Sequence, residues 1–570
     1  MSQLRKFLPS WLIHYPREKL GADLIAGVIV SILVIPQSLA YALLAGLPPQ
    51  FGLYVSIFPV IAYALIGSSM VQAVGPVAIT AIMTYTVLSP IAVPGSPEWI
   101  LLAATLSLLS GLLVLAFGLL RMGFLSQLLS RPVMSGFISG SAVLIVLSQV
   151  KYLLGIFTEG SGIWDILGTL LHQLPDSHGP TLAIGFSALV FLVFSKLALP
   201  TLLAKLGVKQ NQASFIGRLM PLITVLIGTL LVVYFNLDRP GGVRVVGEIP
   251  EGLPSFKFFL PGLDSLQILA VPALLMALVG MVQNISMAQT LAFKRQERVD
   301  ANAELVGLGT SNIVASMYGG MPVGGGISRS AVNVAAGAET PLASIVAASC
   351  MLVMVATAAQ WLARLPLAVL AANIMLAAIS MLDFKTLRQA WAYDRIDAIA
   401  LLGTASGVIF LDLERGIALG IAFSFVNFLL RASTPHIAVI GRISNSEHFR
   451  NVERHQVETI PGVLLLRIDE SLFFGNLNSI DSRLGLELAK APTTTELVLI
   501  MSAVNRIDTT AMEALVEHNR ELAKRGIRLH LAEVKGPVQD RLMRSPLWES
   551  LSGQVFLSVN DAFTTLSKQG

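Results

Sequence analysis

The chain has 570 residues, of which 54% are hydrophobic and only 13% are charged, and its formal net charge at neutral pH is +4. This amount of charge is too small to keep a water-soluble fold of this length in solution. The composition therefore excludes a purely soluble protein and indicates one embedded in a lipid bilayer. Cys350 is the only cysteine, which excludes disulfides within the chain and thiolate metal sites.

The polarity of the chain changes along its length. Residues 1–20 are mixed and basic, unlike a cleavable secretory signal, so we expect a cytoplasmic N-terminal segment. Long apolar runs follow and predict a transmembrane domain at 21–432. A polar linker at 433–455 and a soluble domain at 456–570 complete the predicted organisation.

About fourteen stretches of the transmembrane domain are apolar enough to be membrane spans, in two sets of seven that predict repeats at 24–236 and 265–431. The first set comprises residues 24–45, 52–67, 70–89, 99–120, 131–154, 180–200 and 218–236. The second comprises 265–292, 303–318, 326–337, 341–362, 366–382, 396–412 and 414–431. The third and tenth are too short or too interrupted by Gly and Pro to cross as continuous helices.

Basic residues gather in alternate loops of this arrangement. The loops after spans 4, 6, 8 and 12 carry several Lys and Arg residues each, whereas the opposite loop "SPIAVPGSPEW" carries none. Because basic residues mark the cytoplasmic side, both termini are predicted to be cytoplasmic. We therefore expect a multi-pass protein of the cell's inner (plasma) membrane.

The third stretch, "SSMVQAVGPVAITAI", contains a Gly-Pro break. Pro suits the first position of a helix, where its missing N–H would be unpaired in any case, so a half-helix is predicted to begin at Pro76 in mid-membrane. The amides of Val77, Ala78 and Ile79 would then face a cavity. The alternative is that Gly and Pro are simply common in membrane helices.

The tenth stretch, "GGMPVGGGISRSAV", contains three successive glycines ending at Gly326. Glycine allows backbone conformations closed to other residues, and a second half-helix is predicted to begin near Ile327, with Ser328 and Arg329 in its first turn. Interrupted spans at matching places in two halves are typical of inverted-repeat secondary transporters, with the binding site between the broken helices.

Arg329 indicates that such a site binds an anion. A guanidinium in mid-membrane is costly and should face water or an anion rather than lipid. Together with the positive ends of two helices it supplies roughly +2 charges, which suits a dianion such as sulfate but would serve bicarbonate or chloride nearly as well. The alternative is a structural Arg paired with a carboxylate or with carbonyls, although no Asp or Glu lies within two turns.

Polar side chains in two other spans are candidates for the same cavity. In the first span, Gln37 and Tyr41 are four residues apart and share one face, although hydrogen bonding between helices would also explain them. The eighth span carries Gln283, Ser286 and Gln289 but no ionisable group in the membrane. Because the chain has no phosphate-binding loop, no HExxH motif and no recognisable Ser/His/Asp arrangement, we predict neither an enzyme nor a cofactor.

The soluble tail alternates predicted strands and helices, which indicates a small α/β domain whose helices should cover one face of its sheet. At one strand-to-helix turn, "NRIDTTAMEAL", Asp508 or Thr510 is a suitable N-cap, and Thr510 with Glu513 would form a capping box. Thr509 is less well explained by capping. It could bind a ligand or be phosphorylated at the helix N-terminus.

Several stretches together resemble the sulfate permease (SulP) family, whose animal members include prestin and pendrin. They are "PQSLAYALLAGLPPQFGLY", "VGPVAITA", "GGGISRSAVNVAAGAETPLA" and "DTTAMEAL", and they span nearly the whole chain. The resemblance implies an α-helical polytopic membrane protein of two inverted seven-span repeats, followed by a small cytoplasmic α/β STAS domain. It also implies a homodimer and an elevator-like alternating access, in which a core domain of spans 1–4 and 8–11 moves against a gate domain of spans 5–7 and 12–14.

The resemblance also assigns residues. The family's anion site falls on Gln37, Tyr41, Val77, Ala78, Ser328 and Arg329, and with the neighbouring residues of the two breaks our candidate substrate-binding set becomes Gln37, Tyr41, Pro76, Val77, Ala78, Gly326, Ile327, Ser328 and Arg329. The STAS domain is similar to bacterial anti-sigma-factor antagonists, whose phosphorylated serine aligns with Thr509, so Asp508, Thr509 and Thr510 form a candidate regulatory site.

One departure from the family concerns coupling. Many bacterial and plant members carry an acidic residue in span 8, associated with proton or sodium coupling, where this chain has Gln283. Glutamine cannot titrate, so exchange or uncoupled movement is favoured over symport.

The sequence therefore predicts secondary transport of a small inorganic anion, nominally sulfate. The alternatives are a bicarbonate, chloride or dicarboxylate exchanger, an uncoupled anion channel, and a membrane-anchored STAS signalling protein. The expected partners are the anion, the bilayer, a second copy of the chain and a cytoplasmic partner of the STAS domain, with no nucleic acid.

Overall fold

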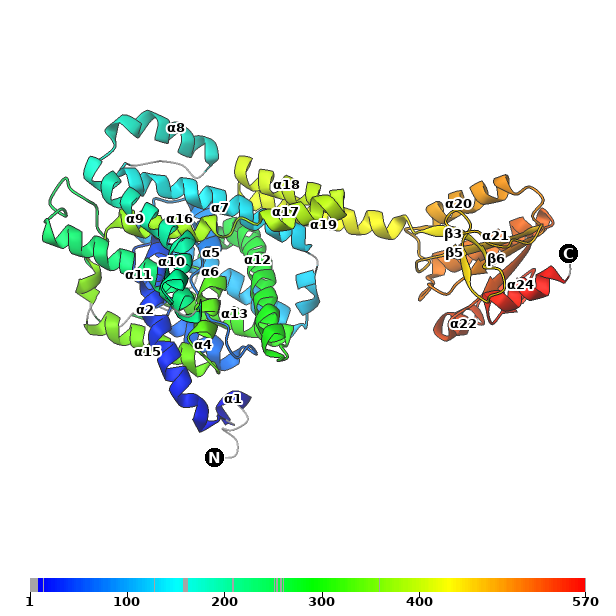
Figure 1. Cartoon of the computed structure of the whole chain (residues 1–570), viewed down its shortest axis with the longest axis horizontal. Coiled ribbons are helices and arrows are strands. Elements are labelled where there is room, and N and C mark those ends of the chain that lie inside the picture. The colour runs from blue at the N-terminus through cyan, green and yellow to red at the C-terminus, as the bar shows by residue number, and fades with distance from the viewer. Residues whose placement is uncertain are drawn as a thin grey trace. The chain divides into compact units, whose positions relative to one another are not determined.

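The structure, a computed structural model, divides into two compact units, Met1–Ser424 and Phe425–Gly570. It describes residues 9–13, 15–127, 129–156, 162–207, 210–250, 252, 255–256, 259, 261–357 and 359–568. The first unit is almost entirely helical, and the second contains a sheet flanked by helices (Figure 1).

The first unit contains two groups of helices that pack mainly among themselves. In the core group, α13 packs along α6 and α4, and α15 packs along α2. The members of this group are α2 (Leu20–Leu44), α3 (Gln50–Tyr54), α4 (Phe58–Ile66), α5 (Ala78–Leu88), α6 (Pro97–Leu119), α12 (Leu263–Arg295), α13 (Ala301–Met317), α14 (Ile327–Ala335) and α15 (Leu342–Thr357).

In the gate group, α7 packs against α16 and α18, and α9 packs against α16 and α11. The members are α7 (Arg131–Leu154), α9 (Gly179–Leu197), α10 (Leu199–Lys205), α11 (Gln210–Tyr234), α16 (Leu367–Ile379), α18 (Arg395–Phe410) and α19 (Leu413–Ser433). The connections contain α1 (Ser10–Ile13), α8 (Ile163–Gln173), α17 (Phe384–Tyr393) and the 3-10 turns Arg17–Lys19, Gly123–Gln127, Leu174–Asp176 and Ala359–Leu362. This division matches the predicted core and gate domains.

Each of the fourteen predicted spans contains a helix, although the third and the tenth are helical only in part. Seven helices in the described residues are long and apolar enough to cross a membrane alone, and four shorter apolar helices accompany them. Helices satisfy their own backbone hydrogen bonds, as a bilayer requires. The short amphipathic helix α17 and the helix α8 were not predicted, because they lie in loops between apolar runs.

The two interrupted spans meet in the middle of the core group. Strand β1 (Val74–Gly75) pairs antiparallel with β2 (Gly324–Gly325), with Val74 opposite Gly325 and Gly75 opposite Gly324. Each strand leads into a half-helix, α5 or α14, so the half-helices begin side by side. The second begins at Ile327 as predicted, but the first begins at Ala78 with Val77 as N-cap, two residues after the predicted Pro76, because Pro76 and Val77 are still part of the extended connection from β1.

The second unit has a six-stranded sheet in the order β4-β3-β5-β6-β7-β8. Strands β5 to β8 run parallel, and β3 runs antiparallel to both β4 and β5. The strands are β3 (Ile437–Arg442), β4 (Phe449–Asn451), β5 (Val463–Ile468), β6 (Glu496–Ile500), β7 (Arg528–Ala532) and β8 (Val555–Phe556). Strands β3 and β4 come from the stretch assigned to a linker by sequence, so the sheet begins earlier than predicted.

Helices cover both faces of this sheet, contrary to the predicted single face. One apolar cluster joins α20 and α21 to alternate strand residues such as Leu466 and Leu499, and a second joins α24 to the intervening residues such as Leu465 and Val498. The helices are α20 (Leu477–Lys490), α21 (Thr509–Lys524), α22 (Gly536–Leu542), α23 (Pro546–Ser550) and α24 (Val559–Ser567). A sheet whose strands are apolar on both sides must be covered on both sides.

Candidate functional site

A cavity of about 490 Å³ lies between the core and gate groups and ends at Arg329. Its wall on the core side is α2, including Gln37 and Tyr41, and its wall on the gate side comes from α9, α11 and α16. Lys196 near the end of α9 and Ser380 just after α16 also line it. Both helices lead from there into the basic loops that the sequence places in the cytoplasm, so the cavity opens toward the predicted cytoplasmic side.

Arg329 is the buried charge of this cavity, with only 5% of its surface exposed. Its Nη1 donates to the Val74 carbonyl oxygen at 3.2 Å and its Nη2 lies 3.4 Å from the Ser38 hydroxyl oxygen. None of the ion pairs among the described residues includes Arg329. The charge is therefore held by neutral groups, and an anion entering the cavity could pair with it.

The backbone beside Arg329 is shaped to admit the guanidinium. A Cβ atom on Gly75 would lie 1.6 Å from Arg329 Nη1, so only glycine leaves room at this place in β1. Ser330 Oγ accepts from the Ala73 amide at 3.0 Å, and the Gly326 amide donates to the Ala73 carbonyl at 3.3 Å. These contacts fix the start of α14 against the connection that leads to α5.

The N-termini of the two half-helices keep their amides available. Val77 and Gly326 are the N-caps of α5 and α14, and within the described part of the chain neither helix receives a hydrogen bond from a side-chain cap. Free amides and the helix dipole favour an anion at both ends. With the guanidinium they form a positive region in the middle of the core group.

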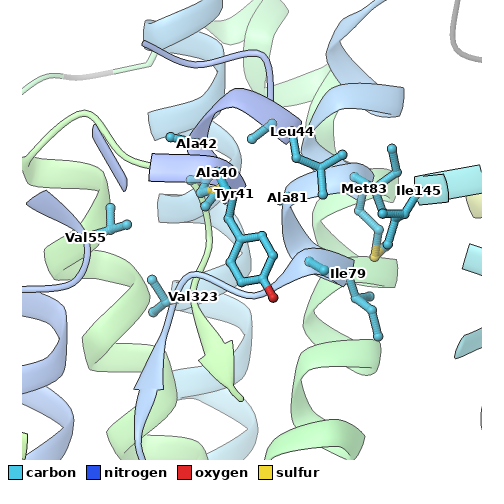
Figure 2. Close-up of a cluster of buried hydrophobic side chains, with 14 of the residues drawn as sticks. Ala40, Tyr41, Ala42, Leu44, Val55, Ile79, Ala81, Met83, Ile145 and Val323 are labelled. Carbon is cyan, nitrogen blue, oxygen red and sulfur yellow. The ribbon is translucent and has the colours of Figure 1, made fainter. Parts of the chain in front are cut away.

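Gln37 and Tyr41 lie on one face of α2, as their spacing predicts. Gln37 Nε2 donates to Tyr41 Oη at 2.9 Å, and both line the cavity. Tyr41 belongs to the same cluster of buried side chains as Ile79 and Val323, and Figure 2 shows its ring extending away from α2. Because the Gln37–Tyr41 bond stays within α2, it is no helix-to-helix link, and the cavity-lining interpretation is the better one.

The other candidate residues differ in how close they lie to the cavity. Pro76, Val77, Ala78 and Gly326 are buried at the half-helix starts but do not border the described cavity. The side chains of Ile327 and Ser328 lie outside the part of the chain that the structure describes. Gln283 on α12 is partly buried, and its Nε2 is 3.4 Å from the Gly325 carbonyl oxygen, so it reaches the strand that precedes α14.

The sequence analysis missed a buried carboxylate, that of Glu304, close to the paired strands β1 and β2. Glu304 on α13 is fully buried and accepts from Tyr63 Oη at 2.5 Å, from the Ser68 amide at 2.8 Å and from Asn284 Nδ2 at 3.0 Å. Asn284 in turn accepts from Gln72 Nε2 at 2.6 Å, close to Gly325. Glu304 thereby connects α4, α12 and α13 below the paired strands. Glu304 is the only acidic residue in the apolar stretch "ANAELVGLG", and this isolation is the sequence feature that could have indicated a buried carboxylate.

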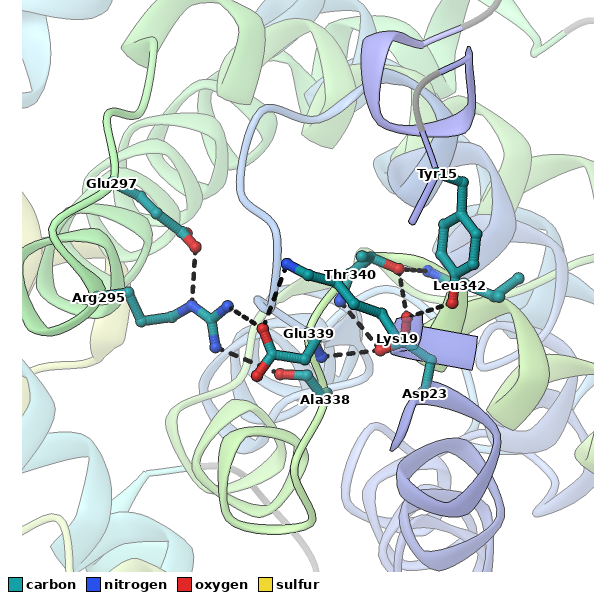
Figure 3. A network of polar contacts seen from close by, with 9 residues as sticks. All are labelled: Tyr15, Lys19, Asp23, Arg295, Glu297, Ala338, Glu339, Thr340 and Leu342. Atoms are coloured by element: carbon teal, nitrogen blue, oxygen red, sulfur yellow. Dashed lines mark hydrogen bonds and ion pairs between the residues drawn. The ribbon is translucent and has the colours of Figure 1, made fainter. Parts of the chain in front are cut away.

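A second polar network joins the helices of the site at one end (Figure 3). Asp23 on α2 is fully buried and accepts from the Glu339 and Thr340 amides at 2.8 and 3.0 Å, just after α14. Glu339 also pairs with Arg295, the last residue of α12, at 3.0 Å. The network therefore links α2, α12 and α14, the three helices that carry Tyr41, Gln283 and Arg329.

Two segments of the chain match known family models. Residues 20–404 match the model described as the sulfate permease family, and residues 454–562 match the STAS domain. The chain belongs to the sulfate permease family. Membership places it among membrane transporters of anions rather than among enzymes, and confirms the resemblance found in its motifs.

Curated relatives from bacteria and plants cover almost the whole chain. A probable sulfate transporter of Mycobacterium tuberculosis is 32% identical over 552 residues, covering 96% of each chain. Sulfate transporter 4.1, chloroplastic, of Arabidopsis thaliana is 33% identical over 572 residues, covering 97% of this chain and 81% of its own. High affinity sulfate transporter 2 of Stylosanthes hamata is 33% identical over 575 residues, covering 97% and 85%.

Solved structures share the fold. The murine solute carrier 26 family member A9 anion transporter, in the inward-facing state, superposes with a TM-score of 0.88 at 24% identity, covering 100% of this chain and 95% of its own. The transmembrane domain of a cyanobacterium bicarbonate transporter, BicA, gives 0.60 at 22% identity, covering 73% and 97%. The fold is thus that of a multi-pass helical transporter with a C-terminal STAS domain, as predicted.

The candidate regulatory turn of the STAS domain lies at the start of α21. Asp508 is the N-cap, with Oδ1 accepting from the Ala511 amide at 2.8 Å and Oδ2 from the Phe474 amide at 2.9 Å. The predicted capping box of Thr510 and Glu513 is wrong, because Thr510 is already inside the helix. Thr509 and Thr510 are exposed, so Thr509 is accessible at the positive end of the helix.

Replacing Asp508 with Ala should loosen α21. Loss of the cap and of the bond to Phe474 should cost about 1–2 kcal/mol of local stability. Amide hydrogen exchange on the full chain should show faster exchange at the start of α21. Thr510→Ala, at an exposed helical position, is the matched control and should exchange at the wild-type rate. Equal protection in both variants would show that Asp508 is not the cap.

Proposed function

We propose that the chain moves sulfate across the membrane by elevator-like alternating access, with the anion held between the two half-helix N-termini and Arg329. The observation that carries the proposal is a cavity that ends at a buried guanidinium with no carboxylate partner among the described residues. The names of the curated relatives, all sulfate transporters, support sulfate as the anion.

The electrostatics of the site favour a dianion. Two helix N-termini and one guanidinium supply roughly +2 charges at the buried end of the cavity, where electrostatic attraction is stronger than in bulk water. Gln37 and Tyr41 add polar groups on the α2 wall, and Ser328 and Ile327 lie in the first turn of α14. Pro76, Val77, Ala78 and Gly326 form the half-helix starts. Pro76 has no N–H and the Gly326 amide already donates to the Ala73 carbonyl, so the Val77 and Ala78 amides would bind the anion once it reaches the end of the cavity.

The separation of the helices into core and gate groups suits rigid movement of one group against the other. The residues of the proposed anion site belong to the core group, whereas the facing wall of the cavity is formed by α9, α11 and α16 of the gate group. Sliding of the core group would carry the half-helices past that wall while their pairing through β1 and β2 stays intact. In the present arrangement the cavity faces the predicted cytoplasmic side, which corresponds to an inward-facing state.

Anion exchange is the coupling mode that the site favours. The resemblance to the family assigns Gln283 to the position where other members carry an acidic residue, and an amide cannot carry a proton. Its Oε1 is buried without a hydrogen-bond partner in the described structure. A bicarbonate, chloride or dicarboxylate exchanger and an uncoupled anion channel would all use the same site. Within the described part of the chain, the positive charge of the cavity is the only feature that favours sulfate over the other anions.

Uptake of labelled sulfate into proteoliposomes that contain the purified protein tests this proposal. We expect uptake that is insensitive to inward proton or sodium gradients, is accelerated by anions trapped inside, and is competed by sulfate more strongly than by bicarbonate or chloride. Currents far above the rate of an alternating-access cycle would instead establish a channel. Uptake driven by a cation gradient would refute exchange.

Gln283→Glu should convert the transporter to proton coupling. A glutamic acid at this place could donate to the Gly325 carbonyl only when protonated, and when ionised it would add negative charge near the site, so its proton should move with the transport cycle. Sulfate uptake should then rise several-fold with an inward proton gradient. Gln289→Glu, exposed on the same helix, is the control and should leave uptake independent of the gradient.

We further propose that both termini lie in the cytoplasm of a plasma-membrane homodimer and that the STAS domain regulates transport through Thr509. The exposure of Thr509 beside the N-terminus of α21 supports this role, because phosphate would be stabilised there. Phosphate incorporation in cells that is lost in Thr509→Val would support it. A signalling role independent of transport would leave the cellular phenotype intact in a transport-dead variant.

A further inference from the structure

A lysine lies between the core and gate groups on the predicted outer side of the transport domain. Lys151, near the end of α7 in the gate group, lies over the ring of Tyr85 from the core helix α5, with 5.6 Å from its Nζ to the ring centroid. It also lies 5.3 Å from the ring centroid of Tyr152. The described part of the chain gives Lys151 no ion pair. Two aromatic faces therefore hold a charge that has no carboxylate to neutralise it there.

This contact lies on the path from the proposed anion site to the predicted outer side. Leu44 is one turn beyond Tyr41 on α2, and Ile82 and Tyr85 are one and two turns beyond Ala78 on α5. These residues border a hollow of about 20 Å³ together with Ser148, Gln149 and Lys151 of α7. Such a space holds about one water molecule, in contrast to the open cavity of about 490 Å³ on the cytoplasmic side.

We call the hollow and the Lys151–Tyr85 contact beside it the seam between the core and gate groups. In alternating access the two groups must separate at this seam before the anion site can open outward. Tyr85 is fixed in the core group, where its ring packs against that of Trp99 at 5.7 Å, and Trp99 is fully buried and donates to the Ala45 carbonyl. Lys151 moves with α7. Outward opening would therefore part Lys151 from the Tyr85 ring and leave its ammonium facing the widened seam.

We propose that Lys151 is an outer gate residue with two states: it seals the seam through Tyr85 when the site faces inward, and it attracts inorganic anions into the seam when the site faces outward. The proposal rests on the proposed alternating access. In the sealed state the ring faces replace water around the ammonium, and in the open state the freed charge raises the local anion concentration.

The charge of the neighbouring surface supports this route. A second cavity on the same side, of about 480 Å³, borders Thr86 of α5 and Pro90 just after that helix. It is lined by Asp165, Asp412 and Glu414 with one cation, Arg415. Carboxylates in excess would repel an anion, so the seam at Lys151 is the electrostatically favoured entrance.

The seal can be tested without transport. In a Cys350→Ser background, Ser148→Cys places the only thiol of the chain at the hollow, where a membrane-impermeant, uncharged thiol reagent applied outside reports opening and is not itself attracted by Lys151. We expect slow modification with Lys151 present and modification several-fold faster after Lys151→Met. Equal rates would show that Lys151 does not seal the seam, whether or not the protein transports sulfate.

The anion-attracting role is tested by sided transport kinetics. Lys151→Met should raise the outer half-saturation concentration of sulfate about tenfold while the inner one stays unchanged, because only the outer entrance loses a charge. Lys151→Arg should retain the wild-type value. Arg364→Gln, another outer cation that pairs with Asp238, is the control and should change neither. An unchanged outer value in Lys151→Met overturns the proposal; no uptake by the wild type would instead contradict the proposed function.

Discussion

Arg329→Ala should reduce sulfate uptake at low substrate concentration by at least about 30-fold while leaving folded protein in the membrane. Removing one partner of a buried charge pair costs about 2–5 kcal/mol, and each 1.4 kcal/mol corresponds to a tenfold change. The loss falls on binding because the guanidinium has only neutral partners among the described residues, the Val74 carbonyl and the Ser38 hydroxyl. Labelled uptake in proteoliposomes and the elution profile of the purified variant measure the two effects separately.

The fold should tolerate this change for an electrostatic reason. Arg in the membrane interior opposes insertion by about 2.5–3.5 kcal/mol, so its removal does not weaken insertion. The substitution also strands no carboxylate, since Arg329 has no ion pair within the described residues. Arg329→Lys keeps the charge but loses the planar fork that reaches two acceptors, so its uptake should lie between those of Ala and wild type. Wild-type uptake by Arg329→Ala would exclude it from the anion site.

The sequence predicted the two half-helices because their breaks have a local cause. Proline at 76 and glycines up to 326 cannot continue a membrane helix without help, and both interruptions lie at the third place of a seven-span set. The pairing of β1 with β2 was not predictable in the same way. Two strands of two residues each, about 250 positions apart, carry no periodicity, and only the folded core brings them together.

The burial of two carboxylates could not be predicted from the sequence, for a different reason. Asp23 and Glu304 are single acidic residues near span ends, where a solvated position is the ordinary expectation. Their burial depends on donors from segments far away in the chain: Thr340 for Asp23, and Tyr63, Ser68 and Asn284 for Glu304. Such networks are set by helix packing, which no single stretch of the sequence encodes.

In the STAS domain, by contrast, the missed elements had local signals. Strand β3 is an apolar run, "IAVI", and α24 carries Val559, Ala562, Phe563 and Leu566 at the spacing of one helical face. Both were overlooked because polar residues surround them. Recognising α24 would have shown that helices cover both faces of the sheet.

Gly75→Ala should abolish transport almost as fully as loss of Arg329, although it adds a single methyl group. The new Cβ would lie 1.6 Å from Arg329 Nη1, and the guanidinium, as the flexible end of its side chain, must move away. Its bond to the Val74 carbonyl and its place at the end of the cavity would both be lost. Because a side chain rather than the backbone yields, the variant should still fold.

Gly324→Ala is a closely matched control, because Gly324 is paired with Gly75 across β1 and β2. Its added Cβ would meet Val77 Cγ2 at 3.4 Å, an ordinary van der Waals contact. We therefore expect near wild-type uptake from Gly324→Ala and severe loss from Gly75→Ala, with similar elution profiles and melting temperatures. Equal loss in both variants would mean that the paired strands tolerate no side chain at all, and that the position of Arg329 is not what limits transport.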